Sequence, residues 1–234
     1  MRRLVIIGTA FLAALSMAAT AHAQAQPVHC DYGDFIEQAL TSGAETYDVT
    51  VAGRAYFRRD GDGCPASAVC QAKSYVIGKD RVLVGKIENG WACAWYGGTR
   101  QTVGWLRATD LAKVAPAPTA KVDWLGDWSR DEDSTVSITR DAHGGMHVKA
   151  FTVNMSRASK PSGGFEGALL VEGFSALYSD FDPKADADYK AQFPGEPSPP
   201  DCSARFRRVD RYLIVSESEA CDGVGASLQG VYAR

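Results

Sequence analysis

Recognisable catalytic motifs are missing from this chain of 234 residues, and histidine is scarce, with four in all. There is no Cys-x-x-Cys pair, no Gly-x-Ser-x-Gly elbow and no phosphate-binding glycine loop. These absences argue against a structural zinc site, a serine hydrolase of the elbow type and a nucleotide-binding enzyme. We therefore expect a protein that is not an enzyme, with no catalytic residue, no cofactor and no metal site.

Long apolar runs are also missing after the first residues, so no segment there approaches the roughly 20 residues of a membrane-spanning helix. At the start, Arg2 and Arg3 precede an apolar run, and the small residues Ala21 and Ala23 follow it. This order is typical of a secretory signal peptide. We expect residues 1–23 to be removed, leaving a protein of the periplasm or the exterior with no membrane insertion.

Positive charge is in deficit as well. Without residues 1–23 the chain holds 23 basic and 28 acidic residues, a formal net charge of −5. A general nucleic-acid-binding protein would need a strongly basic face. We therefore expect no nucleic-acid partner.

Cysteine is present in an even number, and an even count in an exported chain indicates disulfides. Two cysteines lie far from the other four, which predicts one C-terminal bridge. The first four allow three pairings, and the sequence does not choose among them. Of these we favour a short loop staple and a long tether. The predicted bridges are Cys202–Cys221, Cys64–Cys70 and Cys30–Cys93.

The chain divides into an all-β protein of two parts. Prolines among alanines at 115–121 predict an extended linker. Residues 24–45 precede the first part and contain a short helix, because apolar residues follow helical spacing from Phe35 to Leu40. Residues 46–114 and 122–234 are rich in Val, Ile, Trp and Tyr and are interrupted by turn residues, which is typical of strands.

The first part carries a series of short motifs in a fixed order: Gly78-Lys79, Val82 to Val84, Asn89-Gly90-Trp91, Ala92 to Tyr96, Gly104-Trp105 and Leu111. This order resembles bacterial SH3 domains over about residues 47–114. The resemblance implies a small SH3-like barrel that binds cell-wall glycan, a stem peptide or an envelope protein. Such domains are often fused to cell-wall peptidases, so a wall hydrolase is a weaker alternative.

The aromatic residues of this domain allow two interpretations. Large indoles between glycines supply apolar area to a small core, so Trp91 and Trp105 can be packing residues. Alternatively, Trp95, Tyr96 or Tyr56 lines a groove whose aromatic faces hold a peptide or a sugar ring. These five residues are the candidate ligand-binding residues.

The second part has its own alternation. Val136 and Ile138 alternate with polar residues before a glycine turn, and Val148 and Ala150 alternate after it, which predicts a hairpin. We expect a C-terminal antiparallel β-barrel or sandwich, which faintly resembles small secreted calycin and lysozyme-inhibitor barrels. That resemblance implies an alternative function, a periplasmic inhibitor or small-ligand carrier.

Residues 181–201 are rich in proline and in acidic residues, and we expect a long exposed loop there. A calcium loop with Asp182, Asp186 and Asp188 is the alternative. The segment lacks the spacing, the glycine and the terminal glutamate of an EF-hand.

Overall fold

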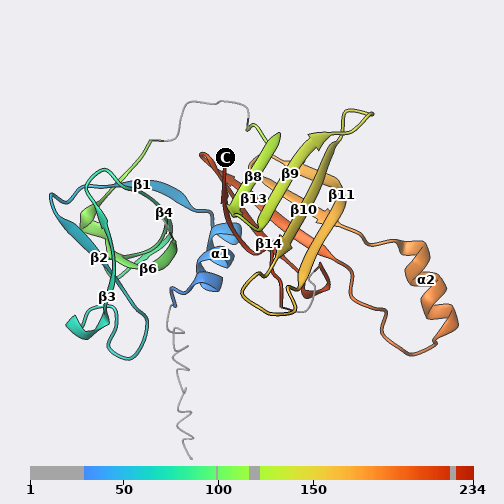
Figure 1. Cartoon of the computed structure of the whole chain (residues 1–234), viewed down its shortest axis with the longest axis horizontal. Coiled ribbons are helices and arrows are strands. Elements are labelled where there is room, and N and C mark those ends of the chain that lie inside the picture. The colour runs from blue at the N-terminus through green and yellow to red at the C-terminus, as the bar shows by residue number, and fades with distance from the viewer. Residues whose placement is uncertain (1–28, 99, 116–121, 222–224) are drawn as a thin grey trace, which may run out of the picture.

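The computed structural model describes residues 29–98, 100–115, 122–221 and 225–234. The expected signal peptide and residues 116–121 of the expected linker lie outside this part of the chain. The described residues form mostly strands, with two α-helices, so the expected all-β class is confirmed. A strand-built domain and a closed barrel lie on either side of the first helix (Figure 1).

The N-terminal domain is one antiparallel sheet in the order β3-β2-β6-β5-β4-β1-β7. Its elements, with the helix before it and two short 3-10 turns, are α1 (Tyr32–Thr41), β1 (Glu45–Val49), β2 (Arg54–Arg58), η1 (Ala68–Cys70), β3 (Gln71–Ile77), β4 (Arg81–Glu88), β5 (Trp91–Gly97), β6 (Gln101–Arg107), η2 (Ala108–Asp110) and β7 (Leu111–Lys113).

Side chains from alternate positions of these strands meet inside the curled sheet. The core consists of small and branched residues around one phenylalanine: Val49, Ala55, Phe57, Val76, Val82, Val84, Ala92, Ala94 and Leu106. The turn before β4 needs its glycine, since a Cβ on Gly78 would lie 2.5 Å from the carbonyl oxygen of Val51. The tight backbone approach explains the Gly78-Lys79 motif.

Helix α1 forms where helical spacing predicts it. The Asp31 side chain caps the helix by accepting from the Asp34 amide at 2.8 Å, and Gly43 follows its end at a φ of 89°. Phe35, Ile36 and Ala39 are all buried. A helix of this length is marginal alone in water, so its stability comes from this packing.

The C-terminal domain is a closed barrel in the order β10-β11-β12-β13-β14-β15-β8-β9, which decides between the barrel and the sandwich. Its elements are β8 (Gly126–Asp131), β9 (Ser134–Arg140), β10 (Met146–Val153), β11 (Ser162–Glu172), β12 (Ser175–Ser179), α2 (Pro183–Gln192), β13 (Ser203–Val209), β14 (Tyr212–Glu217), η3 (Glu219–Cys221) and β15 (Gly230–Ala233).

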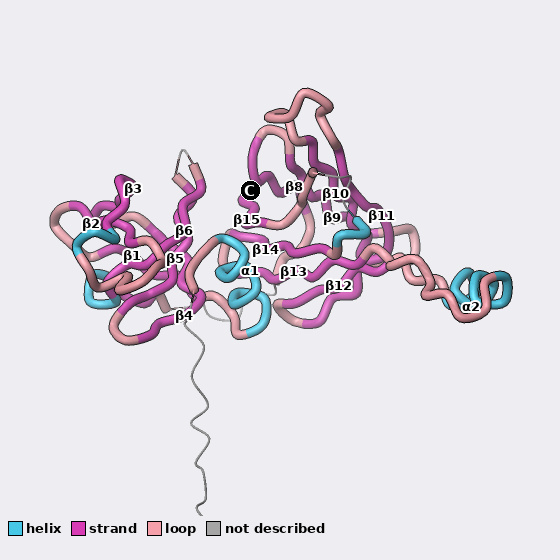
Figure 2. The backbone as a smooth tube through the Cα atoms, turned by 90° about the horizontal axis from the view of Figure 1, so that it is seen from below, coloured by secondary structure: helices cyan, strands magenta, loops and turns pink. Residues whose placement is uncertain are grey.

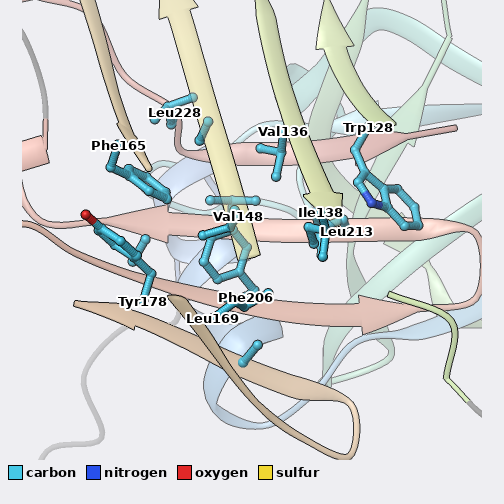
Figure 3. Close-up of a cluster of buried hydrophobic side chains, with 14 of the residues drawn as sticks. Trp128, Val136, Ile138, Val148, Phe165, Leu169, Tyr178, Phe206, Leu213 and Leu228 are labelled. Carbon is cyan, nitrogen blue, oxygen red and sulfur yellow. The ribbon is translucent and has the colours of Figure 1, made fainter. Parts of the chain in front are cut away.

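The barrel interior is filled by side chains. The predicted hairpin is confirmed, since β9 pairs with β10 and Val136, Ile138, Val148 and Ala150 all point inward. Aromatic and aliphatic residues from the other strands complete the cluster (Figure 3). An eight-stranded barrel is just wide enough for its own side chains.

A third apolar cluster joins the two domains and encloses α1. Leu83, Trp95 and Trp105 reach it from the N-terminal sheet, and Tyr212 and Ile214 from the barrel. Apolar residues occupy both sides of β4, a pattern that also suits a tightly curled barrel. The structure shows a different cause, because one side faces the domain core and the other faces α1 and the second domain.

Polar contacts fix the same junction. The Gln101 amide donates to the carbonyl oxygens of Val231 at 2.9 Å and Arg130 at 3.3 Å. Its oxygen accepts from the Tyr32 hydroxyl at 2.7 Å and from the Trp95 indole at 3.1 Å. One glutamine side chain therefore connects α1, the N-terminal sheet and the barrel.

All three favoured disulfides are present: Cys30–Cys93, Cys64–Cys70 and Cys202–Cys221. Cys30–Cys93 ties the start of α1 to β5, and Cys202–Cys221 joins the start of β13 to η3. Disulfides persist in oxidising compartments, which places the folded protein in an extracellular type of environment.

The expected loop at 181–201 is wrong in part, because α2 forms there. Asp182 caps the helix by accepting from the Lys184 amide at 2.8 Å, and Pro183 occupies its first turn. Lys190 forms an ion pair with Asp186 at 2.9 Å, four residues apart. The prolines suggested a loop, but the first one starts the helix and the others follow its end. None of the described helices combines the length and the apolar character needed to cross a membrane.

Candidate functional site

Two of the five aromatic candidates are buried at the domain junction. Trp95 is 2% exposed and meets Tyr212 of the barrel edge to face, with ring centroids 5.2 Å apart. Trp105 is 3% exposed, and its indole donates to the Asp60 carboxylate, which also accepts from the Cys30 amide. Neither ring faces solvent: Trp95 and Trp105 both pack in the apolar cluster at the junction, so neither lines an open groove.

Tyr96 belongs to the core of the N-terminal domain. Its side chain lies on the inner side of β5 and packs against the apolar cluster there. Burial, followed by the nearby Asp80 carboxylate, raises the pKa of the Tyr96 hydroxyl. The ring therefore supports the sheet and is only partly exposed.

Tyr56 lies on the outer side of β2 and forms an aromatic pair with a residue that sequence reasoning missed. Tyr75 lies directly opposite on β3, with ring centroids 5.6 Å apart, and is 40% exposed. The Arg54 guanidinium lies 4.3 Å from the centre of the Tyr75 ring. Alternation along both strands could have revealed this pair, because Arg54, Tyr56 and Tyr75 all occupy outward positions.

Trp91 is half-buried between two arginines. The guanidinium of Arg107 lies 4.9 Å from the Trp91 ring centre, and that of Arg58 lies 5.8 Å from it. Trp91 also packs against the junction cluster. Arg58 lies two residues after Tyr56 on β2, with a register shift between them, and links the two groups of side chains. We call this surface the basic aromatic face; it comprises Arg54, Tyr56, Arg58, Tyr75, Trp91 and Arg107.

The cations of this face keep their charge available. Within the described residues, no carboxylate forms an ion pair with Arg54, Arg58 or Arg107, and the nearby Glu88 is paired with Lys86 at 3.0 Å. Arginine stacked on an aromatic ring retains N–H groups at its edge for carboxylates or phosphates. The face therefore combines flat apolar surface with unpaired positive charge.

A hollow of about 650 Å³ continues the face beyond Arg54. The β1–β2 loop and the β3–β4 turn line it, and it includes Ile77, which is 49% exposed, and Lys79. Its volume lies within the range of roughly 300–1,000 Å³ common for small-molecule sites. Arg54 thus stands between an aromatic pair and a concave surface.

A larger hollow, of about 850 Å³, lies at the mouth of the barrel beside Tyr32 and Arg130. Arg130 uses all its donors within the protein: it bonds Asp131, the carbonyl oxygens of Ser227 and Gln229, and the hydroxyls of Ser134 and Thr152. A guanidinium has five N–H groups, and five bonds satisfy them. Arg130 therefore holds strands together and has no donor left for a ligand.

The described residues offer no cluster of three or more metal-ligating side chains, and Asp182, Asp186 and Asp188 form no such cluster on α2. Asp182 caps the helix and Asp186 is paired with Lys190. Comparison of the chain with protein-family models, with curated proteins and with solved structures gives no match.

Proposed function

We propose that this chain is an exported binding protein that attaches to the cell envelope through the basic aromatic face. The ligand is cell-wall peptidoglycan, through its glycan or its stem peptides; an envelope protein is the other partner that fits. The observation that carries the proposal is the Tyr56–Tyr75 pair, in which Tyr75 is exposed and Tyr56 is partly buried, beside Arg54 and an adjoining hollow.

The chemistry of the face matches that of a glycopeptide. Aromatic faces pack against the apolar faces of sugar rings, and arginine donors pair with the carboxylates of stem peptides. The resemblance of the N-terminal motifs to bacterial SH3 domains supports the same ligand class. Three disulfides and the signal-like start support a location in the periplasm or outside the cell.

A sedimentation assay with purified mature protein and isolated sacculi tests the proposal. We expect the wild-type chain to sediment with the sacculi, and Tyr75→Ala to weaken this binding by roughly tenfold or more, because exposed aromatic anchors contribute about 2 kcal/mol. Arg54→Glu should also weaken sacculus binding, and the loss of binding should be larger at low salt than at high salt.

Phe151→Ala is the matched control, because Phe151 is also an exposed aromatic residue, at 49%, but lies on the C-terminal barrel. It should bind like wild type. Equal loss in Phe151→Ala and Tyr75→Ala, or wild-type protein that stays in the supernatant, would refute the proposed face.

The hollow at the barrel mouth favours a second candidate, an inhibitor acting through the C-terminal barrel. The carrier version has less support, because side chains fill the barrel interior. Lysozyme assays with excess protein test the inhibitor. If the Tyr75→Ala variant still inhibits lysozyme and a variant at the mouth, such as Asn154→Ala, does not, this candidate would be supported over the first.

A further inference from the structure

Residues 180–201 form an arm that projects from the C-terminal barrel (Figures 1 and 2). None of the α2 side chains is buried within the described part of the chain. The contacts that shape the arm are its own: Tyr189 lies against Phe193 with centroids 4.9 Å apart, and Ser198 donates to Asp186 at 2.5 Å. A ten-residue helix held in this way is marginal in water, which favours a partner that covers it.

The arm is acidic and carries exposed apolar groups. It has six acidic residues and two lysines, a formal net charge of −4. Phe181 and Phe193 are 52% and 43% exposed. The chain from Pro194 to Pro200 contains four prolines, which favour an extended conformation with little entropy left to lose on binding.

The basic aromatic face is complementary to this arm in charge and in the kind of side chains that it offers. It offers unpaired arginines where the arm offers carboxylates, and tyrosine rings of the kind that receive proline-rich chains. In Figure 1 the arm lies at the far end of the barrel, away from the N-terminal domain, and Figure 2 agrees. The arm therefore cannot reach the face of its own chain.

We propose that the acidic arm of one copy binds the basic aromatic face of a second copy. Such a contact joins two different surfaces, so each copy keeps one free arm and one free face, and association continues into chains or a ring. The same face would then be shared with the envelope ligand. This competition rests on the proposed function, whereas the self-association does not.

Sedimentation velocity on the mature protein, over about a hundredfold range of concentration, measures the association. We expect the average mass to rise with concentration at low salt. It should fall towards the monomer when salt rises from about 50 to about 500 mM, since the Debye length shortens from about 14 to about 4 Å. A monomer at every concentration and salt would overturn the proposal.

Two variants locate the contact. Arg54→Ala with Tyr75→Ala removes the anchors of the face, and Asp188→Asn with Glu196→Gln neutralises exposed positions of the arm, so the altered face and the altered arm gain no attraction for each other. Each protein alone should be monomeric, but an equal mixture should form dimers and stop there, because one intact arm meets one intact face. Larger assemblies in the mixture, or association of either variant alone, would contradict the arm-to-face contact.

Leu170→Ser is the control for a competing surface, because Leu170 is 71% exposed on the outer side of β11. It should associate like wild type, and loss of association there would overturn the proposal in favour of a β11–β12 contact. Sacculus binding is measured on the same proteins. The arm variant should retain it, so failure of sacculus binding with intact self-association would reject the proposed function alone.

Discussion

Two apolar strand segments of the C-terminal barrel have similar sequences, but the outward side chains of one are buried and those of the other are exposed. Residues 212–215 read YLIV on β14, and residues 168–171 read ALLV on β11. Ile214 points out of the barrel and is 0% exposed, because α1 and the N-terminal domain cover it. Leu170 also points outward and is 71% exposed.

The difference shows what an apolar strand pattern can and cannot report. Alternation gives the two sides of a strand, and the inward side chains of Leu213, Val215 and Leu169 are buried. Whether the outward side is buried depends on a second element that lies far away in the sequence. On β14 that element is α1, which the Cys30–Cys93 bridge holds in place.

Removal of this tether is the largest expected disruption of the covered side. The bridge closes 63 residues, so Cys30→Ala with Cys93→Ala should lower the free energy of unfolding by about 4 kcal/mol in a chain-entropy estimate. Urea unfolding measures the change. The pair Cys64→Ala with Cys70→Ala is the control and should cost only about 2 kcal/mol, because it closes 6 residues. Equal losses would mean that the tether does not act through loop closure.

Truncation on the covered side comes next. Ile214→Ala leaves a cavity between the barrel and α1, and should cost about 3 kcal/mol. Chemical denaturation gives this value, and hydrogen exchange should show faster opening of α1. A loss below about 1 kcal/mol would indicate that α1 follows the change and closes the cavity.

A smaller effect is expected for the ion pair that crosses the junction. Arg205 on β13 donates to Glu37 on α1, and this bond lowers the pKa of the Glu37 carboxyl. A depressed pKa in the folded state stabilises the fold above the unfolded value, near 4.3, and this contribution is lost as pH falls through the folded pKa. Because both side chains are about half exposed, we expect less than about 1 kcal/mol.

The measurement is thermal unfolding of wild type and Glu37→Gln between about pH 7 and pH 3. The two curves should differ at neutral pH and converge in acid. Glu172→Gln is the control, since the Glu172 carboxylate pairs with no cation among the described residues. Its unfolding temperature should change with pH as that of wild type does. A constant Glu37→Gln difference down to the lowest pH would contradict the assignment.

The smallest effect belongs to the uncovered side. Leu170→Ala should change the free energy of unfolding by no more than about 0.5 kcal/mol, because the side chain loses little contact. Urea unfolding beside Ile214→Ala provides the direct comparison. A cost near that of Ile214→Ala would reveal that β11 is covered in solution.

Much of the candidate site was within reach of the sequence, and part was not. Of the five aromatic candidates, Tyr56 and Trp91 are partly exposed, whereas Trp95 and Trp105 are buried. The outward alternation of Arg54, Tyr56 and Arg58 on one strand could have indicated a basic face. Its pairing with Tyr75 needed the register of β2 against β3, which shifts between Tyr56 and Arg58.

The sequence by itself determined the strand class and α1, because spacing, capping residues and short-range hairpins act over a few neighbours. Only the tertiary structure decided which outward sides are covered, and with them the roles of Trp95 and Trp105. Burial of an outward side chain requires another element at the right distance, and that element comes from docking of one domain against the other. The same docking leaves α2 at one end of the molecule and strands β2 and β3 at the other (Figure 1).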